Sequence, residues 1–570
     1  MLKKHVLMLG LALALILSLI GCSGSKTPAD SGSDNNAAAS GSSGSASAQS
    51  SQEDLTPVTF TNFNAGIQLP NIDSNQTEIG KKLEEQTGVN WKMEFLVGDV
   101  KTKIGTMVAS GDYPDVLEPD TELDKVLDAH GFIPLEDLID KYAPNIKKVY
   151  EPYYNQMKAD DGHIYILPFS AVVGDYIPDP NINQGAFWVQ RRVLKEMGYP
   201  KIRTLDQYMD MIKTYMNNHK GEGLMFGGLD YDWRTMSITG APMLLAGSPN
   251  DGGVIVDKQT MKPSVYADSD YMKKWLQKLN ELNSLGMFDK TVFVDNYDQY
   301  LAKLTSGKII GMFDYEWEFD QALQTIRKSG NDDLDYFPLP VTFDENTKDQ
   351  YLDPPTFIQN RGIGITVSAK DPVRIIKFFN TLLEEQNQIM VQWGIEGETY
   401  QRDANGRLTQ TKEQIQKLQD NAYAQKVGIP YFSYSWPMYG QGSTLSDGNS
   451  YVAKRQPEVF QNSITDADKN MLDHYGVKTY AELFAAPDLD RPWYPAWSIS
   501  LEQGSPAQVY STKSADLQKK WIPKIVLADP SDFENQWNAY LKEDSKLDKK
   551  VYEDTMWQLI KEKAAKVTGN

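Results

Sequence analysis

The sequence predicts an α/β fold for the body of this 570-residue chain, with a parallel sheet near its start. Three short segments have the alternation or β-branching of strands, and two helix-like segments that end at a glycine separate them. The predicted strands are 57–61, 90–95 and 115–117, and the helices between them are 77–87 and 101–110. Strands that alternate with helices are typical of a parallel sheet covered by helices. The length indicates two or more domains or lobes.

The later part of the body is predicted to be mostly helical. Helices are expected at 192–197, 205–217, 272–285, 297–306 and, last, at about 552–566. Two further strand-like pieces lie at 308–313 and 362–367. The C-terminal quarter is otherwise read as helices and proline-rich loops.

The N-terminus predicts export and attachment of a lipid. Two lysines precede an apolar run from Val6 to Ile20, which indicates a signal peptide over 1–21. That run is shorter than the about 20 apolar residues that a membrane span needs. The sequence Leu19-Ile20-Gly21-Cys22 resembles the lipobox of bacterial lipoproteins, and Cys22 is the one cysteine of the chain. The resemblance implies a diacylglycerol on Cys22, which anchors the protein to the cell membrane on its extracytoplasmic side.

Residues 22–55 are expected to form a disordered linker behind the lipidated Cys22. They are nearly all Ser, Gly, Ala, Asn, Asp and Gln, and they offer too little apolar surface to offset the entropy of ordering. A coil of this length spans roughly 30 Å, which would hold the body away from the membrane.

Charge and cysteine content exclude several functions. The net charge of −20 falls to about −22 once the signal peptide with Lys3 and Lys4 is removed, and nucleic-acid binders need a basic surface instead. With its single thiol acylated, the mature chain has no disulfide, no cysteine nucleophile and no cysteine metal site.

Several motifs resemble those of the bacterial extracellular solute-binding proteins, over about 56–540. Ser110–Val116 is similar to the turn before the third strand of that family, and Gly131–Ile139, Asp161–Pro168 and Ser306–Phe313 continue the match. Trp393–Tyr400 and Trp521–Lys524 resemble the large lipoprotein branch of its sugar-binding members. One departure is Gln190-Arg191-Arg192, where the family usually has an acidic residue.

The resemblance implies a two-lobed periplasmic-binding-protein-like fold (type II) whose lobes are joined by crossing segments. Its first lobe is expected to comprise 56–170 and 305–395, because the strand 308–313 is thought to return the chain there. Its second lobe is expected to comprise 171–304 and 396–570, with helices at the C-terminus. The family's sugar-binding members deliver an oligosaccharide from the interlobe cleft to ABC permease subunits, so we expect a monomer that performs no chemistry.

Aromatic and acidic residues gather in three places that suit a sugar site. Flat rings can stack on a pyranose, while carboxylates, amides and Arg bind hydroxyls. The first place is 230–234, with Asp232, Trp233 and Arg234, and the second follows the strand 308–313, with Asp314, Tyr315, Glu316 and Trp317. The third combines Trp393 and Glu396 with Trp436 of the loop 431–439. Three more candidates are Asn64, which follows the first predicted strand, Trp188, which precedes a predicted helix, and Arg361, which lies at the expected return crossing.

Three other functions compete with sugar binding. A glycoside hydrolase needs two carboxyls on opposite sides of the bond that it cleaves. Asp314 and Glu316, which are two residues apart on one extended segment, are expected to point the same way. The four histidines of the mature chain are isolated from one another in the sequence and suggest no catalysis. The run Asp466-x-Asp468-x-Asn470 has the opening spacing of a calcium loop, but it has Met471 and Val477 where such a loop needs Gly and Glu. We therefore expect these residues to cap a helix. A calcium site elsewhere on the acidic surface stays an open alternative. A peptide- or pheromone-binding receptor on the same scaffold remains the main alternative.

Overall fold

The computed structural model describes residues 55–182, 184–232, 234–434 and 436–569. Within the chain, Glu53–Asn570 forms one compact unit. The predictions for the signal peptide, for Cys22 and for the linker lie outside the described residues, as does the prediction for Trp233. In the described ranges, every helix is too short or too polar to cross a membrane.

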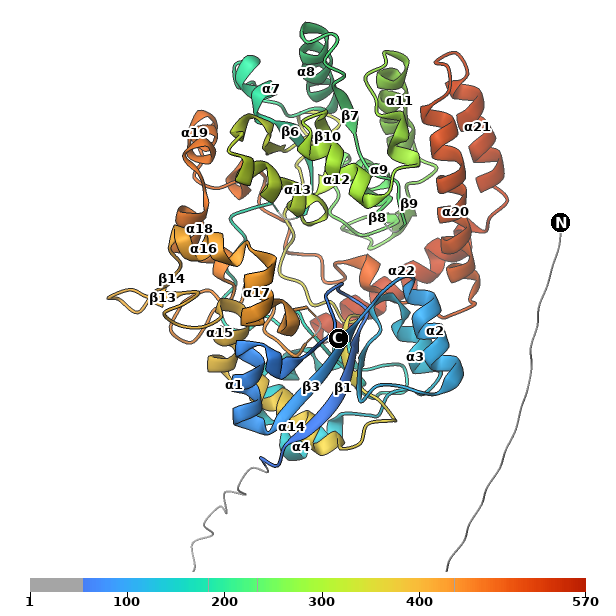
Figure 1. The fold of residues 1–570 in the computed structure, drawn as a ribbon. Coiled ribbons are helices and arrows are strands. Elements are labelled where there is room, and N and C mark those ends of the chain that lie inside the picture. The colour runs from blue at the N-terminus through green and yellow to red at the C-terminus, as the bar shows by residue number, and fades with distance from the viewer. Residues whose placement is uncertain (1–54, 183, 233, 435, 570) are drawn as a thin grey trace, which may run out of the picture. The chain divides into compact units, whose positions relative to one another are not determined.

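The first of two large sheets has six strands in the order β2-β3-β1-β4-β12-β5. Figure 1 labels its two longest strands, β1 and β3, which lie side by side. The six strands are β1 (Val58–Asn64), β2 (Ile72–Asp73), β3 (Val89–Phe95), β4 (Val116–Glu118), β5 (Ile166–Pro168) and β12 (Gly362–Ile365). β1 pairs in parallel with β3 and with β4, while β2, β5 and β12 pair antiparallel to their neighbours. The three parallel strands confirm the strands predicted from the sequence.

The helices between these strands begin and end where the sequence predicts. α1 (Glu78–Thr87) begins at Thr77, whose hydroxyl accepts a hydrogen bond from the Gly80 N–H, and it ends at Gly88, which has a left-handed backbone. α2 (Val100–Ser110) is capped by Asp99 and ends at Gly111 in the same way.

Asp115 explains why the turn motif 110–116 has its sequence. One carboxylate oxygen accepts hydrogen bonds of 2.8 Å from both the N–H and the hydroxyl of Thr61 on β1, and the other accepts one of 2.9 Å from the N–H of Lys370. The buried side chain therefore joins three segments of the first lobe that are far apart in the sequence.

The remaining helices of the first lobe include segments from late in the chain. They are α3 (Leu123–Asp128), α4 (Glu136–Tyr142), α5 (Pro144–Tyr150), α6 (Tyr154–Met157), α14 (Pro372–Leu382), α15 (Glu385–Trp393), α16 (Lys412–Leu418), α17 (Asn421–Val427) and α18 (Pro457–Ser463), with the hairpin β13 (Gln401–Arg402) and β14 (Leu408–Thr409). Leu408, Val427 and Val459 pack into the same core as Phe60 of β1. The expected boundary at residue 396 is therefore wrong, since the apolar residues of 396–459 are needed to cover the first sheet.

The second sheet has the order β11-β6-β10-β7 and contains the strand that was expected in the first (Figure 1). β10 (Ile309–Tyr315) lies antiparallel to β6 (Gly185–Gln190) and parallel to β7 (Met225–Gly227), and β11 (Tyr336–Leu339) covers the other side of β6. The prediction that 308–313 returns to the first lobe is wrong. Only 306–308 separate β10 from the preceding helix α12 (Tyr297–Thr305), and that connection is too short to change sheets.

Helices surround the second sheet and complete this lobe. They are α7 (Arg191–Glu196), α8 (Leu205–Asn218), α9 (Met236–Thr239), α10 (Ala241–Leu245), α11 (Asp270–Ser284), α13 (Glu316–Ser329), α19 (Asp466–Tyr475), α20 (Pro506–Val526) and α21 (Phe533–Asp544). A third, smaller core joins the hairpin β8 (Val254–Val256) and β9 (Pro263–Val265) to the last helix, α22 (Lys549–Thr568). This helix confirms the one predicted at 552–566.

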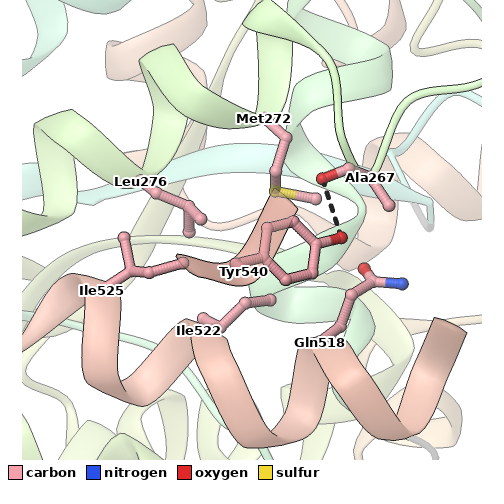
Figure 2. Close-up of a pocket in the computed structure, with 7 residues that line it drawn as sticks. All are labelled: Ala267, Met272, Leu276, Gln518, Ile522, Ile525 and Tyr540. Atoms are coloured by element: carbon pink, nitrogen blue, oxygen red, sulfur yellow. Dashed lines mark hydrogen bonds between the residues drawn. The ribbon is translucent and has the colours of Figure 1, made fainter. Parts of the chain in front are cut away.

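The space between α11, α20 and α21 is an imperfection of packing. Figure 2 shows side chains of all three helices converging on a narrow space. Its lining is mostly apolar but includes the Gln518 side chain, and the Tyr540 hydroxyl donates to the Ala267 carbonyl at 3.2 Å. We assign no ligand to this space, because it has no room even for a water molecule.

The chain passes between the two sheets three times. The first crossing connects β5 to β6, the second connects β11 to β12, and the third follows α18. Side chains tie these crossings together: Arg455 donates to the Ile177 carbonyl at 2.7 Å, and the Tyr494 hydroxyl donates to Asp353. The three connections join two lobes that each have their own core.

Candidate functional site

Polar side chains meet at one end of the first sheet. Asn64 ends β1, Glu118 ends β4, and Arg361 directly precedes β12, which runs in the opposite direction. All three therefore lie at the carboxyl ends of the parallel strands, which is where open α/β sheets bind ligands. The Arg361 Nε lies 2.7 Å from a carboxylate oxygen of Asp120, and Arg361 also faces the Tyr434 hydroxyl.

Asn64 shapes this end of the sheet from within. Its side-chain oxygen accepts hydrogen bonds from the Gly66 N–H at 2.8 Å and the Ile67 N–H at 3.3 Å, and its amide donates to the Tyr434 carbonyl at 3.3 Å. Gly66 is required here, because a Cβ would lie 2.3 Å from the Tyr434 ring. The buried Asn64 thus holds the loop and Tyr434 in place, and it offers a ligand little surface of its own.

Glu118 and Tyr434 are candidates that the sequence did not single out. Glu118 is buried, accepts a hydrogen bond from the Asp120 N–H at 3.0 Å, and has its pKa raised to about 8 by burial and by the neighbouring Asp120 carboxylate. The Tyr434 ring lies 4.3 Å from that of Phe169. Glu118 could have been found, since it follows a predicted strand just as Asn64 does.

The corresponding end of the second sheet is built by the residues after β10. Asp314 is buried, accepts hydrogen bonds from the Tyr300 hydroxyl and from the Tyr315 N–H, and lies beside Glu318 of α13. Burial raises the pKa of both carboxyls, and for Glu318 the Asp314 charge adds to this effect. Two adjacent buried carboxyls cannot both ionise, so they share a proton. Glu318 follows directly on the acids and rings predicted after the strand 308–313, although it is not among the predicted ligand-binding residues.

Trp317 presents its ring at this end of β10. It is 43% exposed, and its centroid lies 5.7 Å from that of Tyr315. Tyr315 itself is buried in the second core, so the prediction that it contacts a ligand is wrong. Glu316 is half-buried, which raises its pKa to about 7. A ring that is partly open and adjoins the half-buried carboxyl of Glu316 has the chemistry of a sugar platform.

Arg234 lies near these carboxyls. Its Nη1 is 2.5 Å from Asp232, and its guanidinium lies over the Tyr297 ring, 4.4 Å from the centroid. The charge of Arg234 lowers the pKa of both Asp314 and Glu318, although less than burial raises it. The cluster predicted at 230–234 and the one predicted at 314–317 are therefore one site, as far as the described residues extend.

Three predicted tryptophan platforms are core residues instead. Trp188 of β6 donates its Nε1–H to the Asp314 carbonyl at 2.9 Å, and Trp393 donates to the Tyr451 carbonyl at 3.0 Å. The Trp436 ring packs edge-on against Trp91 at 5.3 Å. All three are buried, so the prediction that they stack on a sugar is wrong. The sequence shows the type of these residues, but whether each ring is covered depends on segments that are distant along the chain.

The third predicted cluster does not form. Glu396 is exposed beside the β13–β14 hairpin, 3.5 Å from the Tyr400 hydroxyl, while Trp393 is buried beneath it. In the loop 491–497, Trp493 is buried and Trp497 is 38% exposed. Trp497 is therefore the better aromatic candidate of that loop, although the sequence gave no reason to prefer it.

The acidic run at 466–470 caps a helix, as predicted. The Thr465 hydroxyl accepts from the Asp468 N–H, and the Asp468 carboxylate accepts from the Thr465 N–H at the start of α19. Asp468 also pairs with the buried Arg191. Within the described ranges, no group of three or more His, Cys, Asp or Glu side chains could hold a metal ion.

Comparison with known proteins places the chain in a family. Residues 73–389, more than half of its length, match the family described as bacterial extracellular solute-binding protein. The chain belongs to this family. One relative of this solute-binding protein is the fructooligosaccharide ABC transporter substrate-binding protein FusA of Streptococcus pneumoniae serotype 4, which is 29% identical over 247 residues. The match covers 40% of this chain and 45% of FusA, so it spans less than half of that relative.

Solved structures show the same fold for this solute-binding protein. An S. pneumoniae FusA EF-hand mutant in complex with fructo-nystose is 20% identical, with a TM-score of 0.64 over 88% of this chain and 99% of that one. The alginate-binding protein AlgQ2, without calcium ion, is 16% identical, with a TM-score of 0.61 over 90% and 100%. A Bifidobacterium longum infantis protein described as HMO-binding is 15% identical, with a TM-score of 0.60 over 89% and 99%. The fold is thus the type II periplasmic-binding-protein fold.

Proposed function

We propose that this chain is the substrate-binding lipoprotein of an ABC importer, and that it captures an oligosaccharide between its two lobes and delivers it unaltered to permease subunits. The main support is the exposed ring of Trp317 next to the half-buried carboxyl of Glu316, at the end of β10. The ring suits the apolar face of a sugar, and the Glu316 carboxyl suits its hydroxyls. Family membership and the name of the relative FusA support the same function.

Both lobes contribute to the proposed mechanism. Glu118, Asp120, Arg361 and Tyr434 lie at the strand ends of the first sheet, and the Trp317 group lies at those of the second. A ligand that contacts both groups stabilises the closed arrangement of the lobes by its differential affinity for that state. The crossings between the sheets are the segments that would bend.

Binding without chemistry is part of the proposal. Asp314 and Glu318 lie side by side and share a proton, whereas the carboxyls of a glycosidase stand on opposite sides of the bond about 5 to 9.5 Å apart. Both side chains are also buried, so the pair is not placed to cleave a bond of a ligand. We further propose that no cofactor is needed beyond a diacylglycerol on Cys22, and that the chain acts as a lipid-anchored monomer on the extracytoplasmic side of the membrane.

Isothermal titration calorimetry on the body from Glu53 onward tests this function. The panel would contain plant and microbial oligosaccharides, with mixed peptides of similar mass as the alternative ligand class. We expect saturable binding of at least one oligosaccharide, with no new reducing ends after prolonged incubation. Binding of peptides alone would favour the receptor alternative, and glycan turnover above background would favour an enzyme.

A further inference from the structure

We infer that the ligand of the proposed site is an uncharged oligosaccharide, and that the site rejects glycans that carry carboxylate or sulfate groups. This inference rests on the proposed function and narrows its substrate class. The fold does not decide the matter, because similar structures include both an alginate-binding protein and a complex with fructo-nystose. The charges of the site residues do decide it.

Each arginine of the site already faces a carboxylate of the protein. In the first lobe, the Arg361 Nε lies 2.7 Å from Asp120, and its Nη1 donates to the Asn360 carbonyl at 2.9 Å. In the second lobe, the Arg234 Nη1 lies 2.5 Å from Asp232. An anionic sugar is recognised through arginines whose charge is available to it. Here that charge is balanced before any ligand arrives.

The backbone fixes both of these aspartates in place. Asp120 has a φ of 49° and Asp232 a φ of 48°, so each adopts the left-handed conformation that few residues other than glycine tolerate. Asp and Asn tolerate it best because their short polar side chains can bond locally, and such strain concentrates at functional sites. Each lobe thus contains one aspartate with a left-handed backbone whose carboxylate pairs with an arginine of the site.

The remaining acids make the site neutral or negative. Burial raises the pKa of Glu118 to about 8 and that of Glu316 to about 7, and Glu318 shares a proton with Asp314. Glu316 is half-buried and can bind a hydroxyl, whereas Glu118, Asp314 and Glu318 are buried and act on a ligand only through their charge when ionised. A uronate carboxylate beside these groups would lose its hydration without gaining a cation.

Two further basic side chains near the site are also matched by acids. Lys454 and Arg327 both act on Glu316; Lys454 lies 3.7 Å from Asp179, and the Arg327 Nε lies 2.9 Å from Asp335. Among the residues that the structure describes, these two side chains therefore each have an acidic neighbour, as Arg361 and Arg234 do. Their charges are balanced by the protein and not left for an anionic ligand.

The first experiment compares length-matched tetrasaccharides by calorimetry at low and high salt. The neutral arm contains fructo-, xylo- and manno-oligosaccharides, and the acidic arm contains tetragalacturonate and an alginate tetramer. We expect a neutral member to bind with an affinity that salt hardly changes, and acidic members to bind at least 100-fold more weakly. An acidic glycan that binds as tightly as the best neutral one would overturn the inference while leaving the proposed function intact. Binding of no glycan would contradict the proposed function and this inference with it.

The second experiment removes the balancing charge. D120N and D232N keep a side chain that tolerates the left-handed backbone, but they leave Arg361 or Arg234 without its carboxylate. We expect each variant to gain at least tenfold in affinity for the acidic tetramers. The matched control is D333N, which removes an exposed partner of Lys195 and should change neither arm. Thermal unfolding verifies that the variants fold, and folded variants without any gain would show that arginine neutralisation is not the cause, which overturns the inference.

Discussion

Replacing Trp317 by alanine tests the platform on which the proposed function rests. The side chain is 43% exposed, which for a tryptophan of up to about 250 Å² leaves roughly 100 Å² in contact with solvent. A sugar ring covers one face, about half of that area, and the transfer of about 50 Å² of apolar surface contributes about 1.3 kcal/mol at about 25 cal/mol per Å². The dissociation constant should therefore rise about tenfold.

The measurement is calorimetric titration with the best oligosaccharide of the panel, with thermal unfolding in parallel. Trp393→Phe is the matched control, because this tryptophan is fully buried and donates to the Ser450 and Tyr451 carbonyls. The control should lower stability by about 1–3 kcal/mol and leave the affinity unchanged. An unchanged affinity for Trp317→Ala, together with a lower melting temperature, would refute the reasoning and make Trp317 a structural residue.

Three further perturbations test the fold and the anchor. Arg191→Met leaves the buried Asp468 without its paired cation and should lower the free energy of unfolding, measured in urea, by about 3–5 kcal/mol. Lys195→Met removes an exposed ion pair and should lower it by less than about 1 kcal/mol, and equal losses would contradict the reasoning. Burial lowers the pKa of Lys563 to about 7, whereas its ordinary value is 10.5. Between these two values the unfolded chain binds a proton that the folded chain lacks, so the free energy of unfolding should rise with pH across this window. Lys563→Met should flatten the rise, and an unaltered slope would exclude Lys563 as its source. Cys22→Ser should move the protein from the membrane fraction to the medium, and retention in the membrane would argue against the lipid.

Local patterns were sufficient for the first sheet. Alternation in 57–61, the glycines after 77–87 and 101–110, and the turn at Asp115 each act over a few residues, so the sequence shows them directly. The family resemblance likewise depends on short motifs in a fixed order. For this reason the α/β class, the two lobes and the solute-binding family were all predictable, and the comparisons and the structure confirm them.

The sheet that a strand joins was not predictable in the same way. β10 has apolar residues on both faces and would suit either sheet, and only its pairing with β6 and β7 assigns it to the second. The segment 396–459 stays with the first core for a similar reason, since that sheet would otherwise be left uncovered. Such choices depend on partners that are far away along the chain.

The features of the candidate site also fall into those that the sequence shows and those that depend on the tertiary structure. The sequence by itself determined that acids and aromatic rings follow β10 and flank Arg234, because residue type and order along a strand are local properties. Only the tertiary structure decided that Trp317 stays open while Trp188, Trp393 and Trp436 are buried. It also brought Glu118 and Asp120 to Arg361, which is more than 240 residues away in the sequence. Exposure and charge balance are sums over neighbours in space, and these neighbours exist only once the chain has folded.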